Sequence, residues 1–349
     1  METAPLQQNK RSVQRLFGLL GATVIGVLLV SAAAFSMPLF LAADIRHTQS
    51  QPVAQAPELF PVTVDSRNKT IVENPQVNAF LEGPNSPMQA AAWNVQTVLG
   101  YIFDSIATAI AAVPWYQNLG AVDGRFVTID AGMRKEQVAS AFAKALGWTD
   151  AQKKEFLNSS QNQPVQIPEG AFSPGVYLVD PNTTPATARG LVWDHFYKDV
   201  SSHYGTSTEQ MVPLNEALTV ASLIEREAGG PDDMRIISGI IWNRLFIDMH
   251  LQIDATVQYA KANSLATTSW WPKVTPSDIA RKSPYNTYLN PGLPPGPIAS
   301  PSVAAILAAL NPVKTSCLYY FHDANRQFHC SDTYAGHVAL LKKYYGRGK

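Results

Sequence analysis

Apolar residues recur at helical spacing between residues 214 and 228 and predict a helix with one long apolar face. The positions that carry the pattern are Leu214, Ala217, Leu218, Ala221, Ile224 and Ala228. Gly229, Gly230 and Pro231 follow, which is typical of a left-handed cap and a helix end. Glu225 and Glu227 therefore fall in the last turn of this helix.

A carboxylate in the last turn of a helix meets the partial negative charge of the helix dipole. With apolar side chains nearby, both effects favour the protonated carboxyl group, which is the form that a general acid needs. The pattern equally allows solvated glutamates paired with Arg226 or Arg235. Glu225 lies nearer the apolar arc and Glu227 lies at its edge, so periodicity alone does not choose between them.

A second helix, followed by a polar strand, is predicted after Pro231. Residues 249–259, MHLQIDATVQY, alternate apolar and polar side chains, which is the pattern of a half-buried strand. Gln252 and Asp254 belong to its polar face, which either lines a ligand cleft or faces solvent.

The first 43 residues divide into a segment with basic residues and a long apolar segment. Residues 1–15 include Lys10, Arg11 and Arg15, and residues 16–43 contain no charged side chain. A run of that length predicts a transmembrane helix, and its basic flank places residues 1–15 in the cytoplasm and the remaining chain on the exported side of the membrane. The alternative is a signal peptide that is cleaved near the small residues that follow Ser31.

Residues 44–124 predict an extended linker that carries one amphipathic helix near residues 91–113. Residues 125–165 predict a strand and two helices, the second with Thr149 as its N-cap. Residues 166–347 mix helical and strand patterns and are long enough for one sizeable domain. The fold class expected is α+β, with a small subdomain before a mixed α/β domain.

A further helix is predicted after Thr184 or Thr187, and its aromatic residues Trp193, Phe196 and Tyr197 suit either packing or stacking on a ligand. Residues 283–302, SPYNTYLNPGLPPGPIASPS, combine prolines and glycines that preset rigid turns.

A hairpin is predicted near the C-terminus, with its turn at residues 323–325. Pairing Leu318 with His329 makes Cys317 face Cys330, which gives either a disulfide or two free thiols. The spacing of these cysteines and the nearby histidines matches no zinc finger or ribbon, so no metal and no cofactor are expected.

The composition narrows the class of protein. The 349 residues carry a formal net charge of +0, with 46% hydrophobic and 15% charged residues. These values are typical of a globular protein, and they supply no basic face for neutralising phosphates. Nucleic acid is therefore not an expected partner.

Three runs of the chain, ASLIEREAGG, IIWNRLFIDMHLQIDATVQYA and SPYNTYLNPGLPPGPIASPS, resemble the YceG-like family of endolytic murein transglycosylases. Members of that family carry ASIVExE, NRL, MxLQxDxTVxY, YNTY and GLPPGPIxNPS in this order, and five ordered motifs are more specific than any one of them. The resemblance implies that Glu227, the second glutamate of ExE, is the catalytic acid. It implies support from Glu225, Asn243 and Arg244, and substrate binding by Gln252, Asp254, Tyr285, Asn286 and Tyr288.

Residues 125–165 are similar to the LysM-like segment of that family, which implies a role in holding a glycan strand. The family's PDTY sequence is altered here, because Gly175 and Val176 replace its Asp-Thr ahead of Tyr177. His337 corresponds to the family's C-terminal histidine.

The activity that the resemblance implies is cleavage within peptidoglycan glycan strands, with 1,6-anhydro-N-acetylmuramic acid ends as products. Family membership further implies action close to the inner membrane and the cell-wall synthesis complex, at the ends of nascent strands. Two alternatives remain at this point. One is a hydrolytic muramidase with Asp254 or Glu225 as a second catalytic carboxylate, and the other is a non-catalytic, membrane-tethered scaffold that binds glycans.

Overall fold

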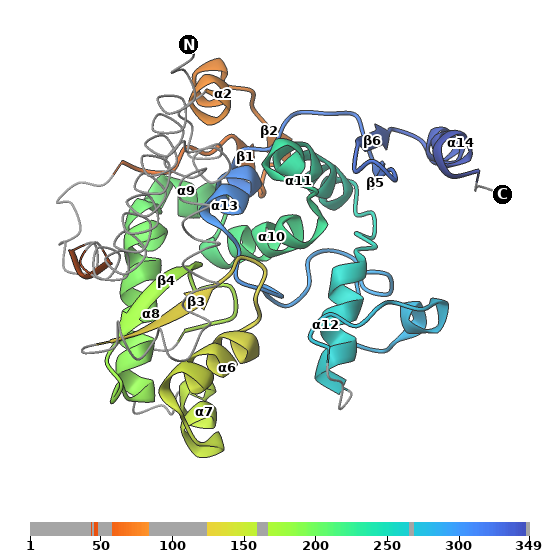
Figure 1. Cartoon of the computed structure of the whole chain (residues 1–349). Coiled ribbons are helices and arrows are strands. Elements are labelled where there is room, and N and C mark those ends of the chain that lie inside the picture. Colours follow the sequence, from red (N-terminus) through yellow and green to blue (C-terminus); the bar gives the residue numbers. More distant parts are fainter. Residues whose placement is uncertain are drawn as a thin grey trace, which may run out of the picture.

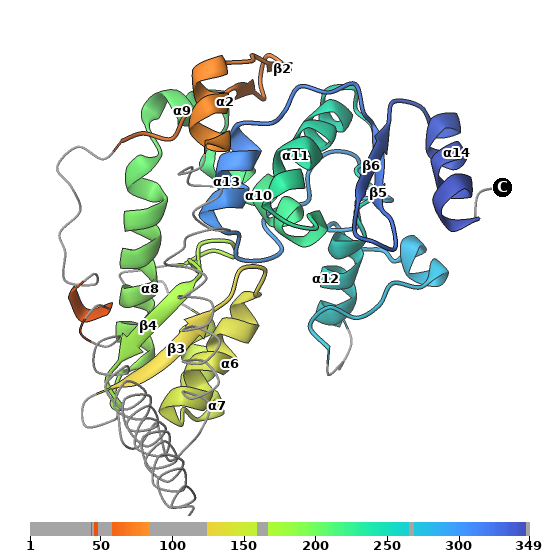
Figure 2. The same ribbon diagram turned by 45° about the horizontal axis from the view of Figure 1, so that its top comes forward.

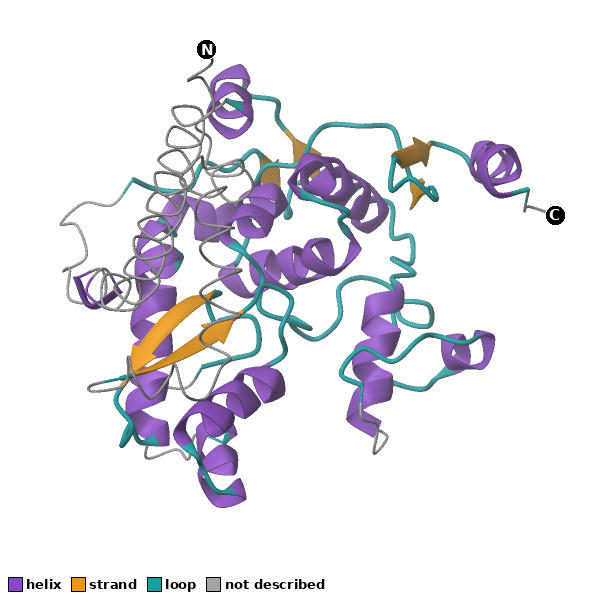
Figure 3. Ribbon diagram, viewed as in Figure 1, coloured by secondary structure: helices purple, strands orange, loops and turns teal. Residues whose placement is uncertain are grey.

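The fold is described from a computed structural model, which describes residues 43, 45–47, 58–83, 124–158, 167–264 and 269–346. Helices predominate, and three antiparallel sheets of two strands each occur in these ranges (Figure 3), so the expected α+β class is confirmed. None of the helices within these ranges is long and apolar enough to cross a membrane. The predicted transmembrane helix at residues 16–43, apart from Ala43, and the amphipathic helix near residues 91–113 lie outside the described residues.

Three helices form the centre of the molecule: α10 (Leu214–Glu227), α11 (Pro231–Phe246) and α13 (Val303–Leu310). They pack against one another in both views (Figures 1 and 2). Helix α13 is rich in alanine, and its buried alanines let α10 and α11 approach its backbone closely. Ser302 caps α13 by accepting a hydrogen bond from the Ala305 amide at 3.2 Å, as expected for a serine at a helix N-cap. The predicted helix at residues 214–228 is confirmed.

The turn between α10 and α11 differs from the predicted left-handed cap. Ala228 ends α10 in an extended conformation, with φ −69° and ψ 141°, and Pro231 is already the first residue of α11. The Asp233 carboxylate accepts hydrogen bonds from the amides of Gly229 and Gly230 at 2.9 and 3.2 Å. The cap prediction was wrong because the two glycines serve the start of the second helix instead of the end of the first.

A smaller layer lies below the centre in Figure 1. Strand β3 (Arg125–Ile129) pairs antiparallel with β4 (Gly175–Val179), and helices α6 (Lys135–Leu146), α7 (Asp150–Leu157) and α8 (Pro185–Asp199) pack around them. The strand and the two helices predicted within residues 125–165 are confirmed. Thr149 and Thr184 cap α7 and α8.

This layer has its own hydrophobic core. The core includes Phe172, Tyr177 and Val192, which lie beyond residue 165, where the sequence places the start of the next domain. Strand β4 and part of α8 therefore pack with the smaller layer, because β3 needs β4 to complete its pairing.

Residues 58–83 pack on the central helices, whereas the sequence suggests an extended linker there. They form β1 (Val64–Asp65), β2 (Thr70–Ile71) and α2 (Pro75–Glu82). The Arg235 guanidinium donates hydrogen bonds to Glu82 and Asn78, both at 2.5 Å. Short elements of this kind carry little periodic signal, which is why the sequence analysis missed them.

The polar strand predicted at residues 249–259 was wrong. Residues 249–253 form a loop, and helix α12 (Asp254–Ser264) follows. Leu251 and Ile253 are buried as the alternation predicts, but Gln252 has a φ of 51°, which lies outside the strand region.

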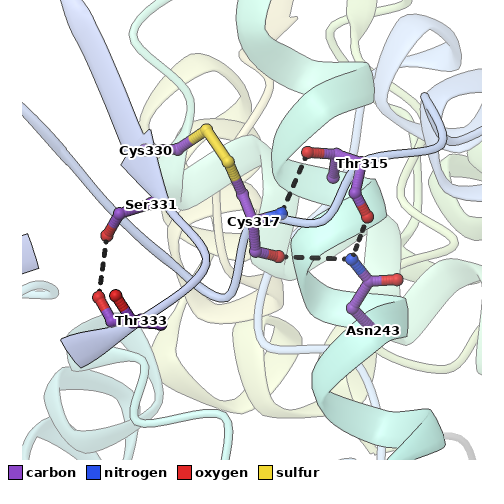
Figure 4. Close-up of a disulfide and its surroundings, with 6 residues drawn as sticks. All are labelled: Asn243, Thr315, Cys317, Cys330, Ser331 and Thr333. Atoms are coloured by element: carbon purple, nitrogen blue, oxygen red, sulfur yellow. Dashed lines mark hydrogen bonds between the residues drawn. A yellow bond between two sulfur atoms is a disulfide. The ribbon is translucent and has the colours of Figure 1, made fainter. Parts of the chain in front are cut away.

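The C-terminal part carries η2 (Pro276–Ala280), a hairpin of β5 (Tyr319–His322) and β6 (Phe328–Ser331), and helix α14 (Tyr334–Tyr345). The disulfide between Cys317 and Cys330 is present (Figure 4), so that prediction is confirmed.

The register of the hairpin differs from the predicted one, because Phe321, and not Leu318, pairs with His329. A longer turn causes this shift. The Asp323 carboxylate holds the turn by accepting hydrogen bonds from the amides of Asn325 and Gln327, at 2.8 and 3.0 Å.

The remaining short helices are η1 (Ser201–His203) and α9 (Thr206–Met211), which connect α8 to α10.

Candidate active site

Helix α10 ends in three charged side chains with different partners. Glu225 accepts hydrogen bonds from the amide and hydroxyl of Ser302 at 3.0 and 2.7 Å, which ties α10 to the start of α13. The Arg226 guanidinium lies 4.1 Å from the centre of the Trp271 ring. Glu227 lines a pocket. The structure thus separates the two glutamates that periodicity left equivalent.

The pocket has a volume of about 520 Å³. Its walls come from the end of α10, from α11 and the loop before α12, from the YNTY segment, and from the hairpin with α14. Its lining residues are Glu227, Arg244, Gln252, Asp254, Tyr288, Tyr319, Tyr320, Phe321, His322, Tyr334 and His337. It therefore joins segments that are far apart in the sequence.

Burial of the Glu227 carboxyl group raises its pKa from 4.5 to about 7. The Tyr320 hydroxyl donates a hydrogen bond to this carboxyl group at 2.8 Å and lowers the pKa, whereas the negative charge of Asp254 raises it. His322 and Arg226 also lower it. At neutral pH the group is therefore divided between its acid and carboxylate forms, so it can both give and take a proton.

Asp254 begins α12 and accepts a hydrogen bond from the Tyr288 hydroxyl at 2.7 Å. The loop before it is fixed to the YNTY segment through Thr287, which accepts hydrogen bonds from the amides of Gln252 and Ile253 at 3.1 and 3.0 Å. Gln252 and Asp254 are both exposed. This wall presents an amide, a carboxylate and a phenol to the pocket, which are groups that bind sugar hydroxyls.

Arg244 lines the pocket and connects two of its walls. Its guanidinium donates hydrogen bonds to the carbonyl oxygens of Leu318, at 2.7 Å, and of Leu251. It also lies 5.5 Å from the centre of the Tyr319 ring. Burial lowers the pKa of Arg244. The arginine therefore holds the hairpin against the loop that carries Gln252.

His322 is held by an acidic residue at the start of α11. Its Nε2 lies 2.5 Å from the Asp233 carboxylate, which also accepts the two glycine amides of the turn before that helix. One carboxylate therefore fixes both the turn after Glu227 and a side chain of the pocket wall.

Three residues that the sequence associates with the site have side chains directed elsewhere. Asn286 is fully buried, and its amide group donates hydrogen bonds to the carbonyl oxygens of Ile279 and Arg281, both at 2.8 Å. The Tyr285 ring packs against Tyr259, with 4.7 Å between the ring centres.

Asn243 is the third, and its side-chain amide group donates hydrogen bonds to the carbonyl oxygens of Thr315 and Cys317 at 2.7 and 3.2 Å (Figure 4). These contacts shape the YNTY loop and the approach to the disulfide, away from the residues that line the pocket.

The hairpin supplies pocket residues that the sequence analysis did not select, above all Tyr320 and His322. Both side chains point to the same side of β5, because alternate residues of a strand share a face. The available signal was the aromatic run of residues 319–321 within a hairpin that the sequence did predict. In the parts of the chain that the structure describes, no three His, Cys, Asp or Glu side chains gather as a metal site would require.

Comparison with known proteins places this site in a family. The model of the YceG-like family matches residues 85–343. The chain belongs to the YceG-like family. Its pocket is thus built from the motifs of that family together with the C-terminal hairpin.

Curated relatives of this YceG-like chain are named endolytic murein transglycosylases. The one from Streptococcus pneumoniae serotype 2 is 29% identical over 244 residues, which cover 69% of this chain and 42% of the relative. The one from Bacillus subtilis is 32% identical over 241 residues, which cover 62% of this chain and 64% of the relative. The chain therefore matches less than two thirds of the length of either protein.

A crystal structure of a putative YceG-like protein from Listeria monocytogenes is also similar. It superimposes with a TM-score of 0.54 at 26% sequence identity, covering 62% of this chain and 75% of that chain.

Proposed function

We propose that this YceG-like protein is an endolytic transglycosylase of peptidoglycan, the activity for which its curated relatives are named. The observation that carries the proposal is one half-buried carboxyl group, that of Glu227, which has a pKa of about 7 and lines a pocket. Such a group is an acid and a base at the same pH, which is what a reaction with a single catalytic carboxyl group requires.

In this reaction Glu227 gives its proton to the glycosidic oxygen between N-acetylmuramic acid and N-acetylglucosamine, and the bond from that oxygen to C1 breaks. The C6 hydroxyl of the same muramic acid residue then attacks C1, and the Glu227 carboxylate takes the hydroxyl proton. The products are a 1,6-anhydro end and a free 4-hydroxyl, and no water is consumed. Glu227 returns to its starting protonation state.

Gln252, Asp254 and Tyr288 are assigned to substrate positioning, because they line the same pocket as Glu227. Arg244 and Glu225 support the site by fixing its walls and the end of α10. Asn243, Tyr285 and Asn286 are assigned to shaping the surrounding loops, since their side chains contact protein atoms outside the pocket.

Further assignments rest on the family resemblance and the sequence pattern. The layer that begins at residue 125 is LysM-like and helps to hold the glycan strand. Residues 16–43 anchor the chain in the inner membrane, with the site on the periplasmic side and close to the cell-wall synthesis complex. There the enzyme ends nascent strands.

The test is mass spectrometry of the products released from purified peptidoglycan by the full-length chain. We expect anhydro-ended muropeptides from the parent protein and from Glu155→Gln, which alters an exposed glutamate of α7. Glu227→Gln should release none.

Reducing ends in place of anhydro ends would identify a hydrolytic muramidase, for which Asp254, in the same pocket, is the second carboxylate. Absence of cleavage by a folded protein that still sediments with peptidoglycan would leave a glycan-binding scaffold.

A further inference from the structure

The pocket continues past the residues assigned to the reaction into a group of aromatic side chains. Tyr319, Tyr334 and His337 line it from the hairpin and from α14. Among the large exposed apolar side chains of the described residues, Tyr334 is the one that lines the pocket, and 62% of its surface is exposed. An aromatic ring that remains exposed at the rim of a polar pocket is a ready contact surface for a ligand.

The rings of Tyr319 and Tyr334 meet at a steep angle. Their centres are 5.8 Å apart and their planes are inclined by 61°. Tyr319 is covered from other directions, because it stacks on His337, with 5.6 Å between ring centres and an angle of 29°, and it contacts the Arg244 guanidinium. Tyr319 and Tyr334 therefore form a corner in which Tyr319 is the fixed side and Tyr334 the open side.

The backbone that carries this corner is held in place at both ends of α14. Thr333 caps α14 by accepting a hydrogen bond from the Gly336 amide at 3.2 Å, which fixes the turn that carries Tyr334. At the other end of α14 the Tyr345 hydroxyl donates to the His322 carbonyl at 2.5 Å. A surface whose backbone is already fixed loses little conformational freedom on binding. Less of the free energy gained from contact with the ligand is therefore spent on ordering the protein.

The chemistry of the corner suits a sugar ring. A pyranose has flat faces of C–H groups that pack on aromatic rings, and hydroxyl groups at its edge that need polar partners. The aromatic corner supplies the first, and the neighbouring Gln252 and Asp254 supply the second from the same pocket.

We propose that Tyr334 and Tyr319 form a sugar-stacking subsite, which takes a ring of the glycan strand next to the bond that Glu227 cleaves. The subsite rests on the proposed function for its ligand. It adds to that function an expected requirement on length: a fragment that occupies both the cleavage position and the subsite should bind more tightly than a fragment that occupies one of them.

The experiment measures binding, by calorimetry, of a tetrasaccharide and a disaccharide of alternating N-acetylglucosamine and N-acetylmuramic acid. The full-length chain carries Glu227→Gln throughout, so that no cleavage occurs. We expect Tyr334→Ala to weaken tetrasaccharide binding by about tenfold and to leave disaccharide binding almost unchanged. Tyr334→Phe keeps the ring and should bind as the parent does.

Tyr344→Ala is the matched control, because Tyr344 is an exposed tyrosine of the same helix that stacks on His329 and does not line the pocket. Thermal unfolding of each variant confirms that the fold is retained.

Unchanged tetrasaccharide affinity in Tyr334→Ala overturns the subsite and would favour a protein partner as the ligand of the exposed ring. An equal loss in Tyr344→Ala, or no tetrasaccharide binding by the parent, overturns it as well. The outcome is independent of the cleavage test: if binding depends on Tyr334 but the chain with its native Glu227 releases no anhydro ends, the subsite is sustained and the transglycosylase activity is refuted.

Discussion

Two glutamates of this protein, Glu169 and Glu227, resemble each other in chemistry and differ in surroundings. Burial raises the pKa of Glu169, as it does that of Glu227, to about 7. Each accepts a hydrogen bond from a tyrosine, Glu169 from Tyr259 at 3.2 Å and Glu227 from Tyr320 at 2.8 Å.

Glu227 lines the pocket described above, and Glu169 is not among its lining residues. Glu169 also accepts the Lys135 amide at the start of α6, at 2.9 Å, and so joins the smaller layer to α12. Glu227 lies where a ligand can reach it. A raised pKa therefore marks a buried carboxyl group, and the adjoining pocket is what distinguishes a candidate catalytic group from a structural one.

The largest expected effect is the difference in reaction rate between the variants in which each glutamate is replaced by glutamine. Glu227→Gln removes the proton donor and should lower the rate of anhydro-muropeptide release by about a thousandfold or more. Glu169→Gln should keep the rate within about tenfold of the parent, since a glutamine oxygen still accepts the Lys135 amide. Comparable losses in both variants would contradict the division into a catalytic and a structural carboxyl group.

The pH dependence of stability should reveal the raised pKa that Glu169 shares with Glu227. Between pH 4.5 and about 7 the folded state keeps the Glu169 proton that the unfolded state releases, so the free energy of unfolding falls as the pH rises through this window. Glu169 accounts for a fall of about 3 kcal/mol. Urea unfolding at several pH values should show a shallower fall in Glu169→Gln, and a slope equal to that of the parent would refute the assignment.

Removing the hydroxyl group of Tyr320 should change the pH dependence of the reaction rate. Tyr320→Phe deletes a hydrogen bond that favours the carboxylate, so the pKa of Glu227 rises further. Because the reaction starts from the protonated acid, its alkaline limb should move to higher pH, with a maximal rate lower by about tenfold. The control is Tyr259→Phe, whose pH–rate profile should match that of the parent. An unshifted limb in Tyr320→Phe would exclude this coupling.

The smallest expected effect belongs to the structural pair. Tyr259→Phe deletes the hydrogen bond to Glu169 and should lower the free energy of unfolding by about 1 kcal/mol, with the catalytic rate unchanged. Thermal unfolding and product release, measured on the same preparation, check both parts. A loss of rate without a loss of stability would assign Tyr259 to the reaction.

Local pattern was enough to predict the helix that carries Glu227. The apolar residues of α10 repeat with helical period because they pack on α11 and α13, so the sequence records their burial directly. The caps at Thr149 and Thr184 are equally local, because each depends on one side chain and the next few amides.

Contacts between distant segments were not predictable in the same way. The alternation at residues 249–259 reflects real burial of Leu251 and Ile253, but Gln252, whose amide donates to the Thr287 carbonyl, has a positive φ that ends the extended run. Motif matching grouped Asn286 with Tyr288, although one is buried and the other faces the pocket. Identity of a motif does not fix the direction of each side chain.

The disulfide and the hairpin it closes also set an order of assembly. Tyr320 follows Glu227 by 93 residues, and Cys317 finds its partner only when residue 330 has been made. A growing chain therefore carries the end of α10 long before it has the wall that turns this helix end into a pocket. Contacts over such separations form late. The Glu227 carboxyl group thus has no complete pocket around it while residues 228–330 are being made, and the newly made chain gains this pocket in one of its last folding steps.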